Sequence, residues 1–303
     1  MDMNLKAHID QLKRQKNAVI LAHYYAPPET QALADYIGDS FYLAKVAKSC
    51  DADILVFCGV SFMGESAKIL NPHKKVLMPD RSADCAMAHM VAPGRIDELR
   101  AQYPDLAVVC YINSTSELKC QSDVCVTSAN AVKIVRALPN QHIFFIPDHN
   151  LGNFVAEQVP EKTVILNDGA CPIHRTLGSD AIRHEMNAHP DAVLLAHPEC
   201  EKAVLDMAEF VGSTSEIIDY AHKSPATEFI IGTEEGVLYK LRQNDPDKHF
   251  YFPTPSPSCH DMKRNTPERV LAVLQNEDGE VTVDEATRAR ALLPLDRMLE
   301  LAR

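Results

Sequence analysis

The sequence predicts an α/β fold of three similar domains, each a three-layer αβα arrangement with a parallel sheet, set about a pseudo-threefold axis. Two observations lead to this prediction. Short apolar runs alternate with helix-like segments along the whole 303-residue chain, which is typical of parallel sheets covered on both faces. In addition, three kinds of landmark recur with a period of about 87 residues, which indicates an internal triplication.

The three landmarks are a strand that begins with Ala-Val, a hydroxyl residue after a short strand, and a cysteine in a loop. The strands begin at Ala18, Ala107 and Ala192, which lie 89 and 85 residues apart. The hydroxyl residues are Ser40, Ser128 and Thr214, which lie 88 and 86 residues apart. The cysteines are Cys85, Cys171 and Cys259, which lie 86 and 88 residues apart.

The first unit, predicted over residues 1–88, begins with an amphipathic helix that carries Leu5, Ile9 and Leu12 on one stripe. The apolar patterns that follow predict its other elements. They are strand 18–22, helix 29–36, a short strand before a turn at 38–40, helix 41–49, strand 54–58, helix 64–70 and strand 76–78.

The second and third units, predicted over residues 89–174 and 175–261, repeat that order. In the second unit the predicted strands are 108–111, 124–126, 143–146 and 163–166, with helices over 117–120, 129–137 and 153–158. In the third unit the predicted strands are 193–196, 210–211, 229–231 and 250–252, with helices over 202–207, 216–221 and 236–242.

Residues 262–303 follow the third unit and are expected to pack back on the body. Thr266 before Pro267 predicts an N-cap with proline at the first helical position, opening a helix to residue 275. A last helical segment, 284–303, contains Pro294.

Composition restricts the classes of function. A formal charge of −12 argues against non-specific nucleic-acid binding, which needs a basic surface. The N-terminal residues have no signal-peptide core, and no apolar run is long enough to cross a membrane, so we expect no membrane association and a cytoplasmic location. The nine cysteines lack the density of a disulfide scaffold, and Cys50, Cys58, Cys110 and Cys125 fit apolar core patterns.

The periodic cysteines are different, because they lie in loops rich in polar residues and proline. If the carboxyl ends of the three sheets converge, Cys85, Cys171 and Cys259 meet and could hold a [4Fe–4S] cluster. Zinc is an alternative, with ligands from Cys171, His174, His197 and Cys200, but the period does not support it.

Polar residues at the same strand ends suggest a reaction site. Ser40, Ser128 and Thr214 are predicted to begin helices, whose free N–H groups bind anions, although ordinary helix caps explain each one singly. Donors and one carboxylate on these segments suit proton transfer at a carbonyl; they are His23, Tyr25, Tyr111, Asn113, His174, His197 and Glu199. No G-x-G occurs, so a dinucleotide fingerprint is absent.

At these residues the chain resembles the quinolinate synthase family, iron–sulfur enzymes of de novo NAD biosynthesis. The resemblance covers essentially the whole chain and is carried by many short motifs. They are L-A-H-Y-Y from Leu21, G-D-S at 38–40, G-V-S-F-M-G-E from Gly59, the segment from Asn71 to Ala88, Y-I-N-S-T-S-E from Tyr111, T-S-A-N at 127–130, P-D-H-N-L-G at 147–152, G-A-C-P-I-H at 169–174, H-P-E-C at 197–200, V-G-S-T at 211–214, I-G-T-E at 231–234 and C-H-D-M-K-R-N-T from Cys259.

The resemblance implies a transferase that condenses iminoaspartate with dihydroxyacetone phosphate to give quinolinate, phosphate and water. It implies a [4Fe–4S] cluster on Cys85, Cys171 and Cys259, with one open iron as Lewis acid. Glu199 would be the base, helped by Tyr25, with His23 and His197 also in the catalytic site. The residues that would line the site and hold substrate groups are His23, Ser40, Tyr111, Asn113, Ser128, His174, His197, Glu199, Ser213 and Thr214.

The chain also departs from the family pattern. Ala170 replaces a common histidine, and Ser61 replaces an aspartate common in G-V-D-F-M. Pro253 and Ser256 stand where some members carry the first two cysteines of C-x-x-C-x-x-C, so a redox switch there is not expected. A transient contact with an iminoaspartate-producing enzyme is possible. Two alternatives remain open, a metal-free α/β sugar-phosphate enzyme and a non-catalytic iron–sulfur sensor.

Overall fold

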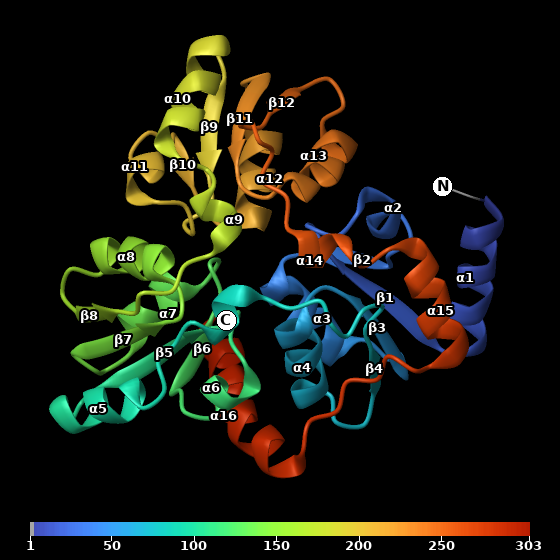
Figure 1. The fold of residues 1–303 in the computed structure, drawn as a ribbon, viewed down its shortest axis with the longest axis horizontal. Coiled ribbons are helices and arrows are strands. Elements are labelled where there is room, and N and C mark those ends of the chain that lie inside the picture. Colours follow the sequence, from blue (N-terminus) through green and yellow to red (C-terminus); the bar gives the residue numbers. More distant parts are fainter. Residues whose placement is uncertain (1–2) are drawn as a thin grey trace.

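A computed structural model describes residues 3–303 and contains three parallel four-stranded sheets. The strand orders are β2-β1-β3-β4, β6-β5-β7-β8 and β10-β9-β11-β12, so each sheet has the same topology. Figure 1 shows the sheets with their helices as three lobes around a common centre. This confirms the predicted α/β fold of three similar domains. The predicted domain limits stay predictions, and residues 1 and 2, where the first unit is predicted to begin, lie outside the described residues.

The first sheet follows the predicted order of strands. Its strands are β1 (Ala18–His23), β2 (Tyr36–Gly38), β3 (Ile54–Cys58) and β4 (Lys75–Leu77). Its helices are α1 (Met3–Gln15), α2 (Pro28–Gln31), α3 (Ser40–Ser49), α4 (Ser61–Leu70) and the 3₁₀ turn η1 (Ala86–His89).

The predicted helix over residues 29–36 is wrong in its second half. Helix α2 ends at Gln31, and Tyr36 is already in β2, paired with Leu21 of β1. Asp35 fixes this change of direction, because its carboxylate accepts the Ile20 N–H at 2.8 Å and its own N–H donates to the Ile20 carbonyl at 2.9 Å. A tertiary contact with the strand therefore overrides the local helical pattern.

The second and third sheets repeat the first. The second has strands β5 (Ala107–Tyr111), β6 (Val124–Val126), β7 (His142–Ile146) and β8 (Thr163–Leu166), with helices α5 (Arg95–Gln102), α6 (Ser116–Lys119), α7 (Ala131–Ala137), α8 (His149–Gln158) and α9 (Pro172–Arg175). The third has strands β9 (Val193–Ala196), β10 (Phe210–Val211), β11 (Glu228–Gly232) and β12 (His249–Tyr251), with helices α10 (Ser179–Ala188), α11 (Lys202–Leu205), α12 (Thr214–Lys223), η2 (Glu235–Val237), α13 (Leu238–Asn244) and α14 (His260–Lys263).

Helices α5 and α10 were not expected from the sequence. Each precedes the first strand of its unit, as α1 does in the first unit. Helix α5 buries only Ile96 and Leu99, and α10 buries only Ile182, so each is anchored by few apolar residues.

The apolar strands and the C-terminal helices build the core. Strands β3 and β5 are buried at every residue, and one hydrophobic cluster joins the first two sheets. Helix α15 (Pro267–Asn276) follows the predicted N-cap Thr266 and packs against α1, α2 and β3. Helix α16 (Glu285–Leu301) packs against β6, α6, α7 and α4, and thereby joins the first and second lobes (Figure 1). Among residues 3–303, no helix combines the length and apolarity needed to cross a membrane.

Candidate active site

The strand registers show that most predicted site residues occupy equivalent positions in the three units. Ala22, Cys110 and Ala196 are equivalent, because each pairs with the corresponding residue of the third strand of its unit. One residue further along the chain lie His23, Tyr111 and His197, and three residues further lie Tyr25, Asn113 and Glu199. By the same registers Ser40, Ser128 and Thr214 are equivalent, just beyond the ends of the second strands β2, β6 and β10. The site is thus assembled from one set of strand ends used three times.

These strand ends line a single cavity at the centre of the molecule, of about 170 Å³. An engineered cavity of about 150 Å³ can hold benzene, so this one is large enough for a small organic molecule. The predicted residues that line it are His23, Tyr25, Ser40, Cys85, Tyr111, Asn113, Ser128, Cys171, His174, His197, Glu199, Thr214 and Cys259. None of its lining residues is lysine or arginine.

Ser213 is the predicted site residue that does not line the cavity. It is the N-cap of α12, where its hydroxyl accepts the Glu216 N–H and its own N–H donates to the Glu216 carboxylate at 2.7 Å. Ser40 and Thr214 begin helices as predicted. Ser128 does not, because the Asn130 side chain accepts the Thr127 N–H at 2.7 Å and closes a turn before α7 begins at Ala131.

The three periodic cysteines have the same local structure. Each immediately precedes a short helix, η1, α9 or α14. The backbone N–H groups of the residues two and three positions later, for example those of Ile173 and His174 at Cys171, favour the thiolate and lower the pKa of each thiol. Burial nevertheless raises the pKa of all three thiols, to about 12 for Cys85, and neighbouring cysteines add to the rise at Cys85 and Cys171.

The chemistry of these three thiols is compatible with holding a metal cluster. None of the nine cysteines, all within the described residues, forms a disulfide. Soft thiolates select iron–sulfur clusters, and the positive charge of a metal offsets the cost of ionising three buried thiols near one another. Cys85, Cys171 and Cys259 are therefore the residues that could hold a cluster.

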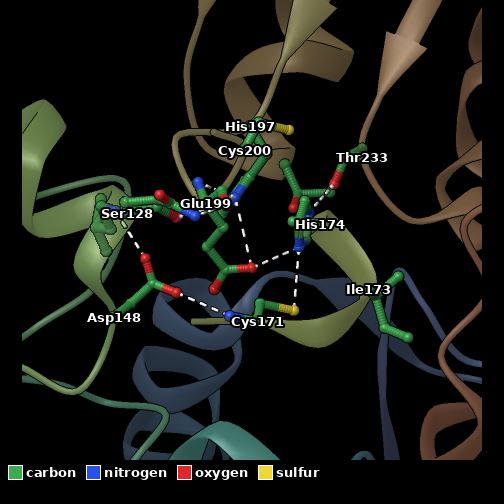
Figure 2. Close-up of polar contacts among 12 residues, drawn as sticks. Ser128, Asp148, Cys171, Ile173, His174, His197, Glu199, Cys200 and Thr233 are labelled. Carbon is green, nitrogen blue, oxygen red and sulfur yellow. Dashed lines mark hydrogen bonds and ion pairs between the residues drawn. The ribbon is translucent and has the colours of Figure 1, made fainter. Parts of the chain in front are cut away.

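A single metal ion has a different candidate set. Ligand atoms of Cys171, His174 and Glu199 lie within 4.8 Å of one another, and within residues 3–303 they form the one His, Cys, Asp and Glu group of this compactness. Cys200 is not part of it: its thiol donates to the Gly232 carbonyl at 3.3 Å, and Figure 2 shows its sulfur directed away from Cys171. The Cys₂His₂ zinc arrangement considered from the sequence is therefore not assembled.

Glu199 is a buried carboxylate that lies close to His174, His197 and Tyr111. Its Oε2 lies 2.7 Å from His174 Nδ1 and 3.7 Å from His197 Nδ1 (Figure 2), and Tyr111 also hydrogen-bonds to it. Burial alone would raise the pKa of Glu199, but the two histidines and Tyr111 outweigh burial and lower it to about 2. Glu199 is thus ionised at neutral pH and able to accept a proton.

His23 and His197 stay neutral in the site. Burial lowers the pKa of His23 and of His197 to about 3. Their Nδ1 atoms accept backbone N–H groups in the same way, from Tyr25 at 3.1 Å and from Glu199 at 3.3 Å. These bonds orient both rings, and His197 Nε2 lies 3.2 Å from the Ser128 hydroxyl.

A chain of hydrogen bonds crosses the cavity wall. The Tyr25 hydroxyl lies 2.9 Å from the Thr214 hydroxyl and 2.7 Å from the Thr233 hydroxyl. Thr233 continues the chain to His174 Nε2 at 3.0 Å, and His174 leads to Glu199. Burial and the nearby Glu199 raise the pKa of Tyr25 well above its usual value, so its hydroxyl keeps its proton.

Two buried polar atoms on the cavity wall have no protein partner. They are Asn113 Oδ1 and the Thr127 hydroxyl, next to Ser128 in the second unit. Buried polar atoms are nearly always hydrogen-bonded, so these two are the ones most ready to contact a bound molecule.

Sequence reasoning missed several polar residues of this region, among them Thr127, Asp148, Thr233 and Glu234. Thr127 and Glu234 line the cavity, Thr233 bridges Tyr25 and His174, and Asp148 accepts the Cys171 N–H at 3.1 Å. Asp148 and Glu234 are equivalent by register, two residues past the third strand of their units. The sequence signal for them is weak, because Val60 stands at the equivalent position of the first unit and breaks the threefold pattern.

Comparison with known proteins agrees with this geometry. The profile of the quinolinate synthetase A protein family matches residues 7–300. A quinolinate synthase of Caldicellulosiruptor saccharolyticus is 50% identical over 298 residues, which is 98% of each chain. A quinolinate synthase of Clostridioides difficile is 48% identical over 302 residues, covering 100% of this chain and 99% of the relative. The similarity therefore includes all three sheets and the whole cavity.

Proposed function

The chain belongs to the quinolinate synthetase A protein family and is an enzyme of the quinolinate synthase type, and on that premise we propose that it condenses iminoaspartate with dihydroxyacetone phosphate. The products are quinolinate, phosphate and two water molecules, which balances all atoms of the two substrates. The reaction contributes the pyridine ring in NAD biosynthesis.

Cys85, Cys171 and Cys259 would hold a [4Fe–4S] cluster. Three equivalent loops bring their sulfurs to one cavity, which is the arrangement expected of a cluster with three protein thiolates. Such a cluster, when bound, supplies an open iron that acts as a Lewis acid on a substrate oxygen. Its ligands can lie farther apart than those of a single ion, which explains why Cys85 and Cys259 do not belong to the compact group around Glu199.

Glu199 is the proposed base. Condensation requires removal of a proton from a carbon beside the carbonyl of dihydroxyacetone phosphate, and an ionised carboxylate on the cavity wall can take it. His174 lies 2.7 Å from Glu199 and can pass the proton toward Thr233 and Tyr25. Tyr25, protonated and at the far end of this chain, is the proposed donor to a substrate oxygen. His23 and His197, held neutral, would donate to or accept from substrate oxygens rather than bind them as cations.

The substrates carry phosphate and carboxylate groups, and the cavity would bind them without basic side chains. Ser40 and Thr214 open the ten-residue helices α3 and α12, whose first N–H groups favour an anion. The Ser128 hydroxyl can donate a further hydrogen bond, and Tyr111 lines the cavity beside it. Asn113 Oδ1, an acceptor without a protein partner, can instead accept from a substrate hydroxyl or N–H group. Ser213 would act only by capping α12 and thereby placing Thr214.

The observation that carries this proposal is the meeting of three equivalent cysteines and the Glu199 network on one cavity. Its test is iron and acid-labile sulfide per chain in anaerobically purified protein, together with quinolinate formation from both substrates. About four iron and four sulfide with activity would support it. Activity without iron would favour the metal-free sugar-phosphate enzyme, and iron without any turnover would favour the sensor. A cytoplasmic location and a transient contact with an iminoaspartate-producing enzyme stay predictions.

A further inference from the structure

Two of the three cysteines are held by a buried carboxylate from a neighbouring loop. Asp148 Oδ2 accepts the backbone N–H of Cys171 at 3.1 Å (Figure 2), and Glu234 Oε1 accepts the backbone N–H of Cys259 at 2.9 Å. Both carboxylates are almost completely buried. Because a buried carboxylate is costly unless its hydrogen bonds repay it, two such groups at equivalent positions require a physical reason.

Each carboxylate uses its second oxygen to hold its own loop. Asp148 Oδ1 accepts the Leu151 N–H at 2.7 Å and caps α8, and Glu234 Oε2 accepts the Gly236 N–H at 2.7 Å. One oxygen therefore fixes the carboxylate, and the other fixes the cysteine. At Glu234 the cysteine-facing oxygen also lies 2.7 Å from Lys263 Nζ.

The cysteine loops do not need these carboxylates in order to form. Asp148 and Glu234 occupy one equivalent position of their units, and in all three units the residue that follows this position donates its N–H to the carbonyl two residues before the cysteine. These bonds run from Ser61 to Ala83 at 2.9 Å, from His149 to Gly169 at 2.6 Å and from Glu235 to Pro257 at 2.8 Å. The first unit makes this contact although Val60 stands at the equivalent position. The loop path is thus set by the backbone, and the carboxylates act on the cysteines themselves.

The first unit holds its cysteine loop through another residue. Asp84, the neighbour of Cys85, accepts the Ser61 hydroxyl, and it lies 2.7 Å from His89 Nε2. The Asp84 N–H in turn donates to Asp261 at 3.2 Å, which ties the Cys85 loop to the Cys259 loop. In the first unit the carboxylate beside the cysteine therefore holds the loop, whereas Cys171 and Cys259 each donate their N–H to a carboxylate from a neighbouring loop.

We propose that Asp148 and Glu234 are positioning residues for the cluster ligands Cys171 and Cys259, an inference that rests on the proposed function. By holding the cysteine N–H groups, they fix the backbone from which each sulfur points into the cavity. Partners of this kind orient metal ligands, and their loss typically weakens metal binding about 10- to 100-fold.

The sharpest test is Asp148→Asn. The asparagine oxygen can still accept the Leu151 N–H and cap α8, but its NH₂ group cannot accept the Cys171 N–H. Asp123→Asn is the matched control, because Asp123 accepts the Val108 N–H at 2.7 Å in the same unit, near the start of β5 and away from the cavity. Glu234→Gln is the second test variant, read out at Cys259.

Three measurements are made on each reconstituted, anaerobic protein. Iron release to a chelator is expected to be roughly 10- to 100-fold faster in Asp148→Asn and Glu234→Gln than in the wild type and Asp123→Asn. The electron paramagnetic resonance spectrum of the reduced cluster should change only in the two test variants. Hydrogen exchange at the Cys171 amide of metal-free protein should accelerate in Asp148→Asn and not in Asp123→Asn.

The outcomes separate this inference from the function it rests on. A wild type that takes up no iron overturns both. A wild type with a full cluster, whose release rate and resonance spectrum are matched by both test variants, overturns the positioning role alone. If Asp148→Asn does not fold, as judged by circular dichroism, the Glu234→Gln measurements decide.

Discussion

The hydroxyl oxygens of Tyr25 and Thr233 lie 2.7 Å apart, so a tyrosine of the first lobe is hydrogen-bonded to a threonine of the third lobe. Thr233 also lies 3.0 Å from His174 Nε2 in the segment that joins the second and third lobes. One hydroxyl therefore couples the proposed acid and base across the cavity.

Thr233→Val should break this coupling while keeping the shape of the side chain. We expect kcat to fall about tenfold or more, because a buried partner left unsatisfied costs about 1–3 kcal/mol and Tyr25 loses its orientation. Iron content should not change. Thr163→Val, at an exposed position of β8, is the control and should retain full activity. An unchanged kcat in Thr233→Val would show that the hydroxyl chain plays no part in proton transfer.

The residues that could be predicted from the sequence are those on repeated, recognisable segments. Cys85, Cys171 and Cys259 share loops of similar composition, and their period predicted both the triplication and their meeting. His23 and Glu199 follow first strands with the same Ala-Val start, so they could be placed at one edge.

The remaining residues depend on tertiary contacts that leave no local pattern. Val60 stands where Asp148 and Glu234 are, so the third-strand position shows no shared chemistry along the sequence. In the sequence Thr233 is an ordinary threonine at a strand end, and only the tertiary structure shows that it lies between Tyr25 and His174. The turn at Asp35 likewise depends on Ile20, fifteen residues earlier, and this is why the predicted helix over 29–36 was too long.

Glu199→Gln should remove the proposed base without removing its hydrogen bonds entirely. Loss of a general base typically costs 10²–10⁴-fold in rate, so kcat/KM should fall by roughly that factor while iron content is unchanged. The matched control is Glu201→Gln, two residues away and exposed. A Glu199→Gln enzyme with wild-type kcat/KM would require another base.

Cys171→Ala should lose the cluster, because two thiolates would remain for a site built for three. The measurement is iron and sulfide per chain after anaerobic reconstitution, with the visible spectrum. Cys200→Ala is the control, since this buried thiol donates to the Gly232 carbonyl and lies outside the cavity. Full iron content in Cys171→Ala would exclude this ligand, and loss of iron in Cys200→Ala would revive the zinc-type ligand set.

Thr127→Val is expected to weaken substrate binding without lowering the stability of the protein. The Thr127 hydroxyl is buried at the cavity and has no protein partner, so its loss costs no hydrogen bond and the melting temperature should not fall. If the hydroxyl contacts a substrate, KM for that substrate should rise roughly 5- to 10-fold with little change in kcat. Unchanged KM values for both substrates would place this hydroxyl outside the binding site.

The buried neutral histidines should make the metal-free protein sensitive to mild acid. The pKa of His23 is lowered from 6.5 to about 3 by burial, so below pH 6.5 the unfolded chain takes up a proton that the folded chain refuses. The contribution of His23 to the free energy of unfolding is therefore fully present above pH 6.5 and is lost as pH falls toward 3. Between pH 7 and pH 5 this contribution falls by about 2 kcal/mol.

Other buried groups titrate in the same range, so the effect is measured as a difference. Burial and Glu199 raise the pKa of Asp148 to about 7, so Asp148 makes the folded protein more stable as pH falls, opposite to His23. His197, whose pKa is lowered like that of His23, adds to the loss of stability. His23→Asn keeps an acceptor for the Tyr25 N–H but cannot be protonated. The free energy of unfolding in urea should therefore drop by about 2 kcal/mol less between pH 7 and pH 5 in His23→Asn than in the wild type. His73→Asn, at an exposed position, is the control and should show the same drop as the wild type. If His23→Asn also showed the same drop as the wild type, His23 would already be protonated in the folded protein at pH 5.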